Sequence, residues 1–530
     1  GGGGWMMRRQ KDLLKWLISC WVCSELILSC ISDIGTHDLR KKDGICLAGV
    51  GTGMDFPMAC KRTEVNIVHL EENSVEWRRE KVRQAVIHAW EGYERSAWGK
   101  DEVLPVTGEG VDNFGGVGTT ILDSVGTLYL LGLSEQYERA RNWVRDELDW
   151  SAVGDVVIFE TVIRALGGLV STYELTRDRV FLYRAEELAL LLAPAFDTPT
   201  GIPFQRCFLN VSVCYFRDEY ASALLAEAGS LQLELRALDF HSNNEEIHRI
   251  RLMADHVLDV IHDKTTPDMN GIPPAKVNVN SGEFVTNYVT LGAPSDSYFE
   301  YLAKLWIQGD FQETKYQSRY VAWVEGMLKK MLHVSEAGDT FVFERAGDAV
   351  VTKMDHFTCY IPGVLAITVD YLDLSIHGRR IFEELAVNIT RTCHLMYSKS
   401  PSGLAGEHIR IHRDRWVISG GYELRPEAIE AFFYLWRRTK EDKYREWAWE
   451  VFEKIEQFCR APYGYSTVLH SRARHPRQDN VMHSFVIAET FKYLYLIFSD
   501  DDVLPLDTYV FNTEAHPLRI RPEIPWGEST

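Results

Sequence analysis

The chain has no excess of positive charge. Its 530 residues include 57 Lys and Arg against 76 Asp and Glu, a formal net charge of -19 at pH 7. Proteins whose main partner is nucleic acid or an anionic membrane rely on clustered Lys and Arg. The composition therefore argues against both partners and makes a neutral or cationic ligand, or a metal ion, easier to accommodate.

Cysteines at metal-ligand spacing are also missing. Of 10 cysteines, Cys20, Cys23 and Cys30 lie in one hydrophobic stretch and the rest are scattered. Zinc sites need short, regular ligand spacing, and a CxxC within an apolar stretch is more often incidental. The cysteines therefore predict no metal site.

A hydrophobic run free of charge is absent at the N-terminus. Residues 13–32 are about as long as a membrane-spanning helix, but Lys15 and Glu25 interrupt them, and a charge near the centre costs roughly 2.5–3.5 kcal/mol on insertion scales. Basic residues precede the run. We expect a signal anchor or uncleaved signal peptide, with residues 1–70 forming the cytoplasmic segment, the anchor and a stem. An unusual buried helix is the alternative.

What the chain does contain is a large core and a repeat of helical hairpins. It is 46% hydrophobic and 12% aromatic, which suits a globular protein of this length. Helix-turn-helix patterns recur with turns near residues 135, 177, 243, 310, 376 and 440, and a last helix covers residues 488–498. These make about seven helix pairs. An open solenoid shares this pattern, but unequal loops favour an all-α, closed α/α barrel.

Several acids lie in aromatic-rich surroundings, and three are paired with a second functional group one helical turn away. The pairs are Glu160 with Arg164, Asp296 with Glu300, and Glu427 with Glu430. Such spacings place both members on one helix face, and burying a carboxylate is costly unless something pairs with it or protonates it. Glu489 and Glu514 have similar surroundings. Acid/base or metal-assisted hydrolysis requires such a ring of acids, although a helical Glu–Arg pair alone is equally typical of a structural ion pair.

Five motifs carry a family resemblance. FETVIRALGG, DSYFEYLAKLW, LRPEAIEAFFYLW, SFVIAETFKYLY and FNTEAHP follow in this order, and the chain resembles the class I α-1,2-mannosidases, glycoside hydrolase family 47. The resemblance implies an (α/α)7 barrel over residues 71–520 with a short tail, 521–530. It also implies removal of terminal α-1,2-linked mannose from high-mannose N-glycans, inversion at the anomeric carbon, and a required calcium ion.

The resemblance assigns the catalytic roles. Glu160 is the expected general acid, acting directly or through a water, with Arg164 orienting it. Glu427 is the expected general base. Asp296 is a third catalytic carboxylate, either an assisting acid or a second base. An inverting glycosidase needs its acid and base about 6.5–9.5 Å apart so that a water fits between them.

The resemblance also implies the binding residues. Thr513 is expected to offer hydroxyl and carbonyl oxygens to calcium, a cation that prefers oxygen ligands. The residues expected to hold calcium-bound waters or sugar hydroxyls are Glu300, Glu430, Glu489 and Glu514. His356 and Arg425 match polar pocket contacts, and Phe485 matches a residue that stacks under the sugar, although core packing explains Phe485 nearly as well.

Four further positions bear on the activity and the subtype. Cys359 and Cys393 match the disulfide of the processing enzymes, which the related degradation factors of the endoplasmic reticulum generally lack. Gly126 stands where the family usually has Asp, so a carboxylate that either braces the pocket or holds a hydroxyl is missing. Pro294 replaces the Arg of endoplasmic reticulum types and the Leu of Golgi types.

The expected protein is therefore a processing mannosidase of the endoplasmic reticulum or Golgi lumen. We expect a monomer that is a type II membrane protein, or secreted if the N-terminal segment is cleaved. Two sequons, Asn210-Val-Ser and Asn388-Ile-Thr, fit this route. The alternatives are a glycan-binding quality-control factor with weak or no hydrolysis, and a helical-repeat scaffold.

Overall fold

The computed structural model describes residues 70–217, 219–413 and 415–521. The predicted anchor at residues 13–32, nearly all of the stem and residues 522–530 of the tail lie outside this part of the chain. Within it, no helix is both long and apolar enough to cross a membrane.

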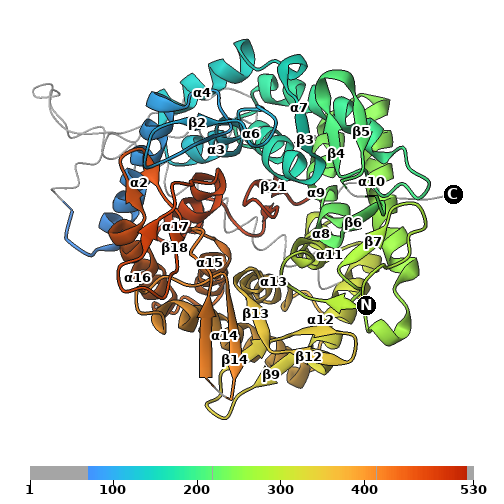
Figure 1. Cartoon of the computed structure of the whole chain (residues 1–530), viewed down its shortest axis with the longest axis vertical. Coiled ribbons are helices and arrows are strands. Elements are labelled where there is room, and N and C mark those ends of the chain that lie inside the picture. Colours follow the sequence, from blue (N-terminus) through green and yellow to red (C-terminus); the bar gives the residue numbers. More distant parts are fainter. Residues whose placement is uncertain (1–69, 218, 414, 522–530) are drawn as a thin grey trace, which may run out of the picture. The chain divides into compact units, whose positions relative to one another are not determined.

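The described residues form a closed ring of seven helix pairs (Figure 1). The inner helices are α3 (Thr119–Leu130), α6 (Gly167–Thr176), α9 (Gln232–His241), α11 (Asp296–Gln308), α13 (Ile361–Thr368), α15 (Glu427–Thr439) and α17 (Phe491–Ile497). Their outer partners, in the same order, are α4 (Ser134–Asp146), α7 (Arg179–Leu192), α10 (Glu245–Lys264), α12 (Thr314–Lys330), α14 (Ile376–Ser398), α16 (Lys443–Phe458) and α2 (Val75–Ser96). Because α17 packs against α2, the ring closes, and the predicted hairpins and barrel are confirmed.

Local sequence explains where the helices begin and which face they bury. The side chains of Ser74, Asp178 and Asn244 accept backbone hydrogen bonds at the starts of α2, α7 and α10, as good N-caps do. The outer helices bury one face only, whereas α11 and α15 are buried along almost their whole length. The inner helices therefore form the wall of the barrel.

Short helices and antiparallel strand pairs connect the helix pairs. The short helices are α5 (Ile158–Glu160), α8 (Leu225–Gly229), η2 (Trp150–Ala152), η3 (Thr161–Leu166), η4 (Ala193–Phe196), η5 (Leu209–Val211), η6 (Pro267–Met269), η7 (His356–Tyr360) and η8 (Val486–Thr490). Of these, η3 and η8 are π-helical and lead into inner helices α6 and α17. Such turns are frequent at functional sites.

The strands form small sheets of two or three members. The two-stranded sheets pair β1 (Glu102–Val103) with β2 (Gly110–Val111), β6 (Ser222–Leu224) with β7 (Lys276–Asn278), β9 (Leu332–Val334) with β10 (Thr340–Val342), β16 (Arg460–Ala461) with β17 (Gly464–Tyr465), β18 (Val468–Leu469) with β19 (Arg477–Gln478), and β20 (Tyr509–Phe511) with β21 (Pro517–Arg519). The three-stranded sheets are β3 (Asp155–Val157), β4 (Arg206–Phe208) and β5 (Val213–Tyr215); β8 (Tyr288–Val289), β11 (Glu344–Ala346) and β12 (Ala349–Val351); and β13 (Lys353–Asp355), β14 (His408–His412) and β15 (Arg415–Ser419).

The β20–β21 hairpin reaches the centre of the ring (Figure 1). Its turn is held by Asn512, whose Nδ2 donates to Ile163 O at 3.0 Å and to Glu234 Oε1 at 2.7 Å. The neighbouring Thr513 and Glu514 line a cavity among the inner helices. The hairpin therefore places two predicted site residues inside the barrel.

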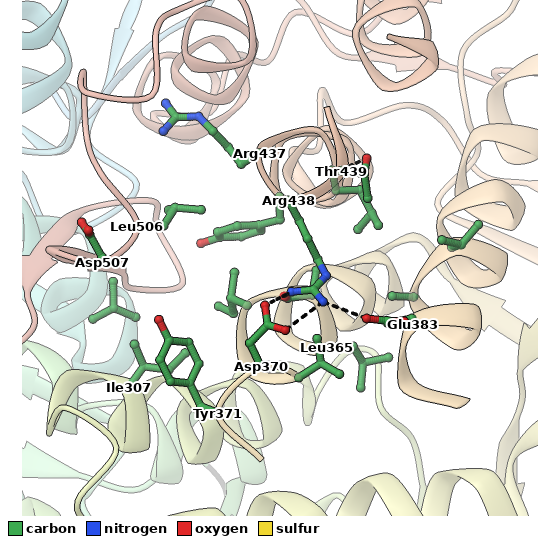
Figure 2. A pocket seen from close by; sticks show the side chains of 18 of the residues that line it. Ile307, Leu365, Asp370, Tyr371, Glu383, Arg437, Arg438, Thr439, Leu506 and Asp507 are labelled. Atoms are coloured by element: carbon green, nitrogen blue, oxygen red, sulfur yellow. Dashed lines mark hydrogen bonds and ion pairs between the residues drawn. The ribbon is translucent and has the colours of Figure 1, made fainter. Parts of the chain in front are cut away.

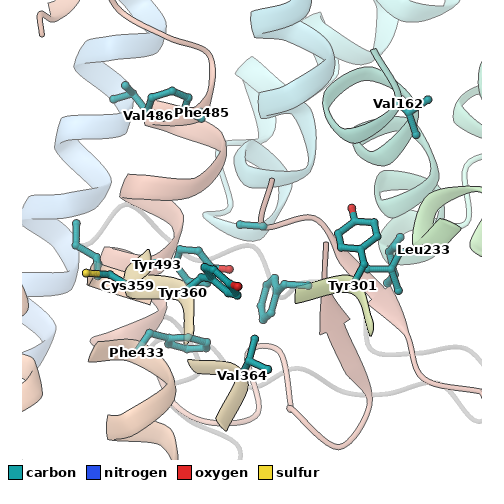
Figure 3. Close-up of a cluster of buried hydrophobic side chains, with 14 of the residues drawn as sticks. Val162, Leu233, Tyr301, Cys359, Tyr360, Val364, Phe433, Phe485, Val486 and Tyr493 are labelled. Carbon is teal, nitrogen blue, oxygen red and sulfur yellow. The ribbon is translucent and has the colours of Figure 1, made fainter. Parts of the chain in front are cut away.

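Aromatic side chains from several inner elements cluster in the protein interior (Figure 3). Phe433 of α15, Tyr493 of α17 and Phe511 of β20 form a triangle with ring centroids 5.5–6.0 Å apart. Tyr301 and Tyr360 lie in the same cluster. Burying each large apolar side chain contributes about 1.5–3 kcal/mol, so this aromatic cluster stabilises the ring.

The expected Cys359–Cys393 disulfide is confirmed, with Cα atoms 6.0 Å apart. It ties η7 to α14. A second disulfide, Cys207–Cys214, joins facing residues of β4 and β5 and was not foreseen, because two cysteines 7 residues apart face each other only once the hairpin register is known.

Replacing both Cys359 and Cys393 with Ser is expected to lower the free energy of unfolding by about 3–4 kcal/mol in the chain-entropy model, since the sequence separation is 34 residues. The Cys207–Cys214 disulfide closes a loop of only 7 residues, so replacing both of these cysteines with Ser is expected to lower the free energy of unfolding by only about 2 kcal/mol. Urea unfolding of the two variants compares them directly. Equal losses would contradict the loop-length argument.

Candidate active site

Two cavities lie at opposite ends of the inner helices. The larger, ≈ 580 Å³, lies at the C-terminal ends of α11, α13 and α15 (Figure 2). It contains none of the predicted site residues, and three of its charged groups pair with one another: Arg438 with Asp370 and with Glu383. The smaller, ≈ 300 Å³, lies where α11 and α15 begin. Its volume is at the lower end of the range typical of small-ligand pockets.

The smaller cavity, called the acid pocket below, gathers the predicted residues from across the sequence. Those that line it are Glu160, Arg164, Asp296, Glu300, Arg425, Glu427, Glu430, Phe485, Glu489, Thr513 and Glu514. His356 is the exception. It is buried behind the wall and contacts Glu427 instead of lining the pocket.

Glu160 and Arg164 form the predicted one-turn pair. Arg164 Nε donates to Glu160 Oε2 at 2.7 Å, and its Nη1 donates to Ser484 Oγ at 3.1 Å and to Glu514 Oε2 at 3.2 Å. Burial alone would lower the pKa of the Arg164 guanidinium, but the charges of Glu514, Glu160 and Asp123 raise it well above its usual value. Arg164 is therefore a fixed cation that holds Glu160 at the pocket wall.

Glu427 is the first residue of α15, where the helix dipole favours a negative charge. His356 Nδ1 lies 2.9 Å from Glu427 Oε2, and His356 Nε2 lies 2.9 Å from the Tyr397 hydroxyl. Burial would raise the pKa of Glu427, but the His356 hydrogen bond and the charge of Arg425 lower it below its usual value. Glu427 is therefore an ionised carboxylate facing the pocket, able to accept a proton.

Asp296 begins α11 and has the opposite character. Its Oδ1 accepts a hydrogen bond from Ser297 N at 2.9 Å. Burial raises the pKa of Asp296 to about 7, and the charges of Glu427 and Glu300 act in the same direction. Two carboxyl groups whose pKa values are pushed apart in one pocket are typical of acid/base catalysis.

The floor of the pocket is crowded with carboxylates. Lys304 is ion-paired with Glu300, and its Nζ lies 3.5 Å from Glu430. Burial raises the pKa of Glu489 well above its usual value, and the charges of Glu514 and Glu427 add to this. A cation or a set of bound protons is needed to relieve such repulsion.

Direct coordination by several side chains is not the arrangement found here. In the described part of the chain, no group of three or more His, Cys, Asp or Glu side chains is placed to ligate one metal ion. Thr513 is nevertheless at the pocket floor with Glu489 and Glu514. These oxygen donors suit a hard cation that binds one threonine directly. Such a cation, for example calcium, can keep bound waters that the surrounding carboxylates hold.

Sequence reasoning missed several polar residues of the pocket and its wall. Glu227 lines the pocket and accepts from Gln205 Nε2 at 3.1 Å, and Asp123 accepts from Ser484 Oγ at 2.5 Å and lies 3.0 Å from His516 Nε2. Both acids have apolar neighbours, in SALLAEAG and TTILDSV. The pattern that selected Glu489 could therefore have found them.

The structure also places the two departures from the family pattern. Gly126 is buried in α3, and a Cβ there would meet Thr172 Oγ1 at 3.2 Å, on α6. It is not among the residues that line the acid pocket, so the reading in which a carboxylate here holds a sugar hydroxyl is not supported. Pro294 does line the pocket.

Comparisons with known proteins agree on one group. Residues 85–520 match the model of glycosyl hydrolase family 47. The chain is 38% identical to a mannosyl-oligosaccharide 1,2-alpha-mannosidase of Arabidopsis thaliana, covering 84% of this chain and 79% of that protein. It is likewise 38% identical to the endoplasmic reticulum mannosyl-oligosaccharide 1,2-alpha-mannosidase of Mus musculus, over 87% and 72% of the two chains. The solved alpha-1,2-mannosidase from Trichoderma reesei superimposes with a TM-score of 0.77 at 26% identity, covering 84% of this chain and 99% of that one.

Proposed function

The chain belongs to glycosyl hydrolase family 47, and from this premise we propose that it removes terminal α-1,2-linked mannose from high-mannose N-glycans, with inversion and with calcium. That it is a glycoside hydrolase follows from the family and its relatives. The substrate rests on the relatives named mannosyl-oligosaccharide 1,2-alpha-mannosidases. The single observation that supports the chemistry is the position of Glu427 and Asp296, which begin two inner helices and line one pocket, where the surroundings lower the pKa of Glu427 and raise that of Asp296.

In the proposed reaction, Glu427 takes a proton from a water, whose oxygen attacks the anomeric carbon. The bond from that carbon to the leaving oxygen breaks, and the leaving oxygen receives a proton from Glu160, directly or through a water. His356 holds Glu427 in orientation at 2.9 Å, and Asp296 acts as the assisting acid because its pKa of about 7 lets it carry a proton near neutral pH. Attack from the face opposite the leaving group inverts the configuration.

Two residues position the sugar in this scheme. Phe485 lines the pocket, stacks on His483 with centroids 5.0 Å apart, and lies below Arg164. Its ring offers an apolar face to a mannose ring. Arg425 donates to Glu407 at 2.6 Å and keeps remaining donors for sugar hydroxyls, since a guanidinium has five N–H groups.

The donor set of the pocket floor fits calcium. Thr513 would offer hydroxyl and carbonyl oxygens, and Glu300, Glu430, Glu489 and Glu514 would hold its waters. When bound, the ion supplies positive charge that polarises oxygen atoms at the pocket floor. The raised pKa values of Glu489 and Glu514, caused first by burial, support a cation there, because these acids repel one another without one.

The pH profile of kcat/KM is expected to be bell-shaped. Activity requires Glu427 without its proton, and the pKa of Glu427 lies below its usual value, so kcat/KM should fall only at pH values more acidic than those at which an ordinary glutamate titrates. Activity also requires Asp296 with its proton, so kcat/KM should decline as pH rises through about 7. In Asp296→Asn, kcat/KM should be much lower at every pH. It should still fall at acidic pH, but it should no longer decline at alkaline pH. An unchanged alkaline limb in that variant would assign it to another group.

The direct test follows the mass of a nine-mannose N-glycan incubated with the protein, with and without a calcium chelator. Stepwise loss of hexose that stops with chelator supports the proposal, and the end point distinguishes single-residue from broad trimming. The anomer released first, read by NMR, should be the β form. If the glycan binds but keeps its mass, the protein is a glycan-binding factor. That result would also contradict a processing role in the endoplasmic reticulum or Golgi lumen.

A further inference from the structure

A chain of three hydrogen bonds runs from Glu427 into the protein interior. His356 Nδ1 lies 2.9 Å from Glu427 Oε2, and His356 Nε2 lies 2.9 Å from the Tyr397 hydroxyl. The Tyr397 hydroxyl in turn donates to the Tyr422 hydroxyl at 3.5 Å. His356, Tyr397 and Tyr422 are only 1–2% exposed, so they depend on one another for hydrogen bonds.

The two tyrosines lie outside the acid pocket. Tyr397 is near the end of outer helix α14, and Tyr422 precedes α15 in a segment that pairs with Val468. Neither is among the residues that line the pocket, and the proposed reaction gives them no task. A buried tyrosine hydroxyl usually has a hydrogen-bond partner, and here the partner of Tyr397 is the histidine that contacts the general base.

The contact between His356 and Tyr397 lies one turn from a covalent link. Cys359 follows His356 by three residues in the 3-10 helix η7. Cys393 precedes Tyr397 by four residues in α14. Each spacing places both residues on one side of their helix. Because Cys359 and Cys393 form a disulfide, η7 and α14 are fixed against each other at the point where His356 meets Tyr397.

The carboxylate decides which nitrogen of His356 carries a proton. Ionised Glu427 can only accept hydrogen bonds, so Nδ1 carries a hydrogen and donates it. When His356 is neutral, Nε2 has a lone pair, and the Tyr397 hydroxyl donates to it. When His356 is charged, Nε2–H donates to the Tyr397 oxygen, and the Tyr397 hydroxyl donates to Tyr422. Tyr397 therefore satisfies the ring in both protonation states.

We propose that Tyr397 is a positioning residue for the general base, because it holds the His356 ring so that Nδ1–H stays directed at Glu427. The proposal rests on the proposed function, in which Glu427 takes a proton from water. Without the Tyr397 hydroxyl, Nε2 loses its bond in the protein interior. An unsatisfied buried nitrogen is unfavourable, so the ring turns to recover a partner and leaves Glu427.

Several charged groups besides His356 act on Glu427. Burial raises the pKa of Glu427, whereas the His356 hydrogen bond and the charge of Arg425 lower it. The carboxyl groups whose charges interact with that of Glu427 are Asp296 on α11, Glu430 on α15 and Glu489 on η8. Like charges favour the protonated form. Weakening the His356 contact is therefore expected to raise the pKa of Glu427 from its lowered value.

Tyr397→Phe is expected to lower kcat by about 10- to 100-fold and to change KM by less than about threefold, because a misplaced base slows proton transfer without touching the sugar. The fall of kcat/KM at acidic pH should begin at a higher pH than in the parent, since the pKa of Glu427 rises. Trimming of the nine-mannose glycan, followed by mass across the pH range, gives both results. An unchanged kcat with an unchanged pH profile would overturn the proposal.

The matched control is Tyr320→Phe. Tyr320 is fully buried on outer helix α12, and its hydroxyl lies 2.6 Å from Thr368 Oγ1. Neither residue lines the acid pocket. Each variant removes one buried hydroxyl from an outer helix, so a purely structural effect lowers both melting temperatures alike. Only Tyr397→Phe should change kcat and the pH profile, and an equal loss of kcat in the control would contradict the proposal.

A double-mutant cycle tests whether Tyr397 acts through the base. Once Glu427→Gln has removed the base, adding Tyr397→Phe should lower the residual kcat by less than about twofold, because coupled residues are not additive. A further loss as large as that in the parent would show that Tyr397 acts elsewhere, and the proposal would fail.

An NMR measurement separates the proposal from the function on which it rests. A proton shared between imidazole Nδ1 and a carboxylate gives a far-downfield ¹H signal, which needs no hydrolysis and is assigned by its loss in His356→Gln. The signal should persist in Tyr320→Phe and should shift or broaden in Tyr397→Phe. If the parent does not trim the glycan, the proposed function fails, while this signal still tests the contact. A signal that Tyr397→Phe leaves unchanged would refute the positioning role.

Discussion

Glu427→Gln is expected to reduce kcat by about 10³-fold or more while KM changes less than about threefold, in line with the contribution of a positioned general base. The amide has the shape of the carboxylate, so packing at the start of α15 and the contact with His356 can be retained. It cannot accept a proton from water. Product release measured by mass, together with glycan binding by calorimetry, checks both parts of the expectation.

The matched control is Glu80→Gln, another buried glutamate, which pairs with Arg83 on outer helix α2. It is expected to leave kcat unchanged. Azide gives a second readout, because this anion attacks without needing a base. It should restore turnover to Glu427→Gln and yield a glycosyl azide of inverted configuration. If Glu427→Gln retains more than a tenth of the parent kcat, another residue is the base.

Removal of calcium is expected to abolish hydrolysis and to lower the melting temperature. The reason is the arrangement at the pocket floor, where the pKa values of Glu489 and Glu514 are raised, first by burial and then by neighbouring acids. A cation at Thr513 would relieve this repulsion. A ligand present at a hundred times its Kd stabilises the folded state by about 2.7 kcal/mol, so a shift of several degrees is expected between chelator-treated and calcium-loaded protein.

Thr513→Val keeps the size of the side chain and removes the hydroxyl ligand. It should lower the apparent calcium affinity in the thermal-shift titration, a readout that does not depend on hydrolysis. Magnesium is the ion control, because it demands a small octahedral site and loses its waters reluctantly. Full activity and an unchanged melting temperature after exhaustive chelation would refute a calcium requirement.

Much of the site was predictable because its chemistry has a local signature. An acid beside aromatic residues on a helical stretch is unusual in any context, and this criterion found Glu489 and Glu514 without knowledge of the fold. The turns between helices near residues 177 and 440 could also be predicted from local sequence, because a polar turn between two apolar stripes is visible in one window of sequence. The Cys359–Cys393 pair came from resemblance alone.

Other features depend on long-range geometry. His356 was expected to contact sugar, but it lies behind the wall and holds Glu427, which only the packing of η7 against α15 decides. The Cys207–Cys214 bond depends on the register of β4 with β5. The effect of Gly126 could not be judged until its neighbours on α6 were known.

The sequence by itself determined the helix pairs, the acids and the expected reaction class, because periodicity and the cost of burying charge act over one or two turns of chain. Only the tertiary structure decided which acid carries a proton. Asp296 and Glu427 each begin an inner helix, yet the pKa of one is raised by burial and that of the other is lowered by His356 and Arg425. That difference comes from residues far apart in sequence, which meet only when the ring closes.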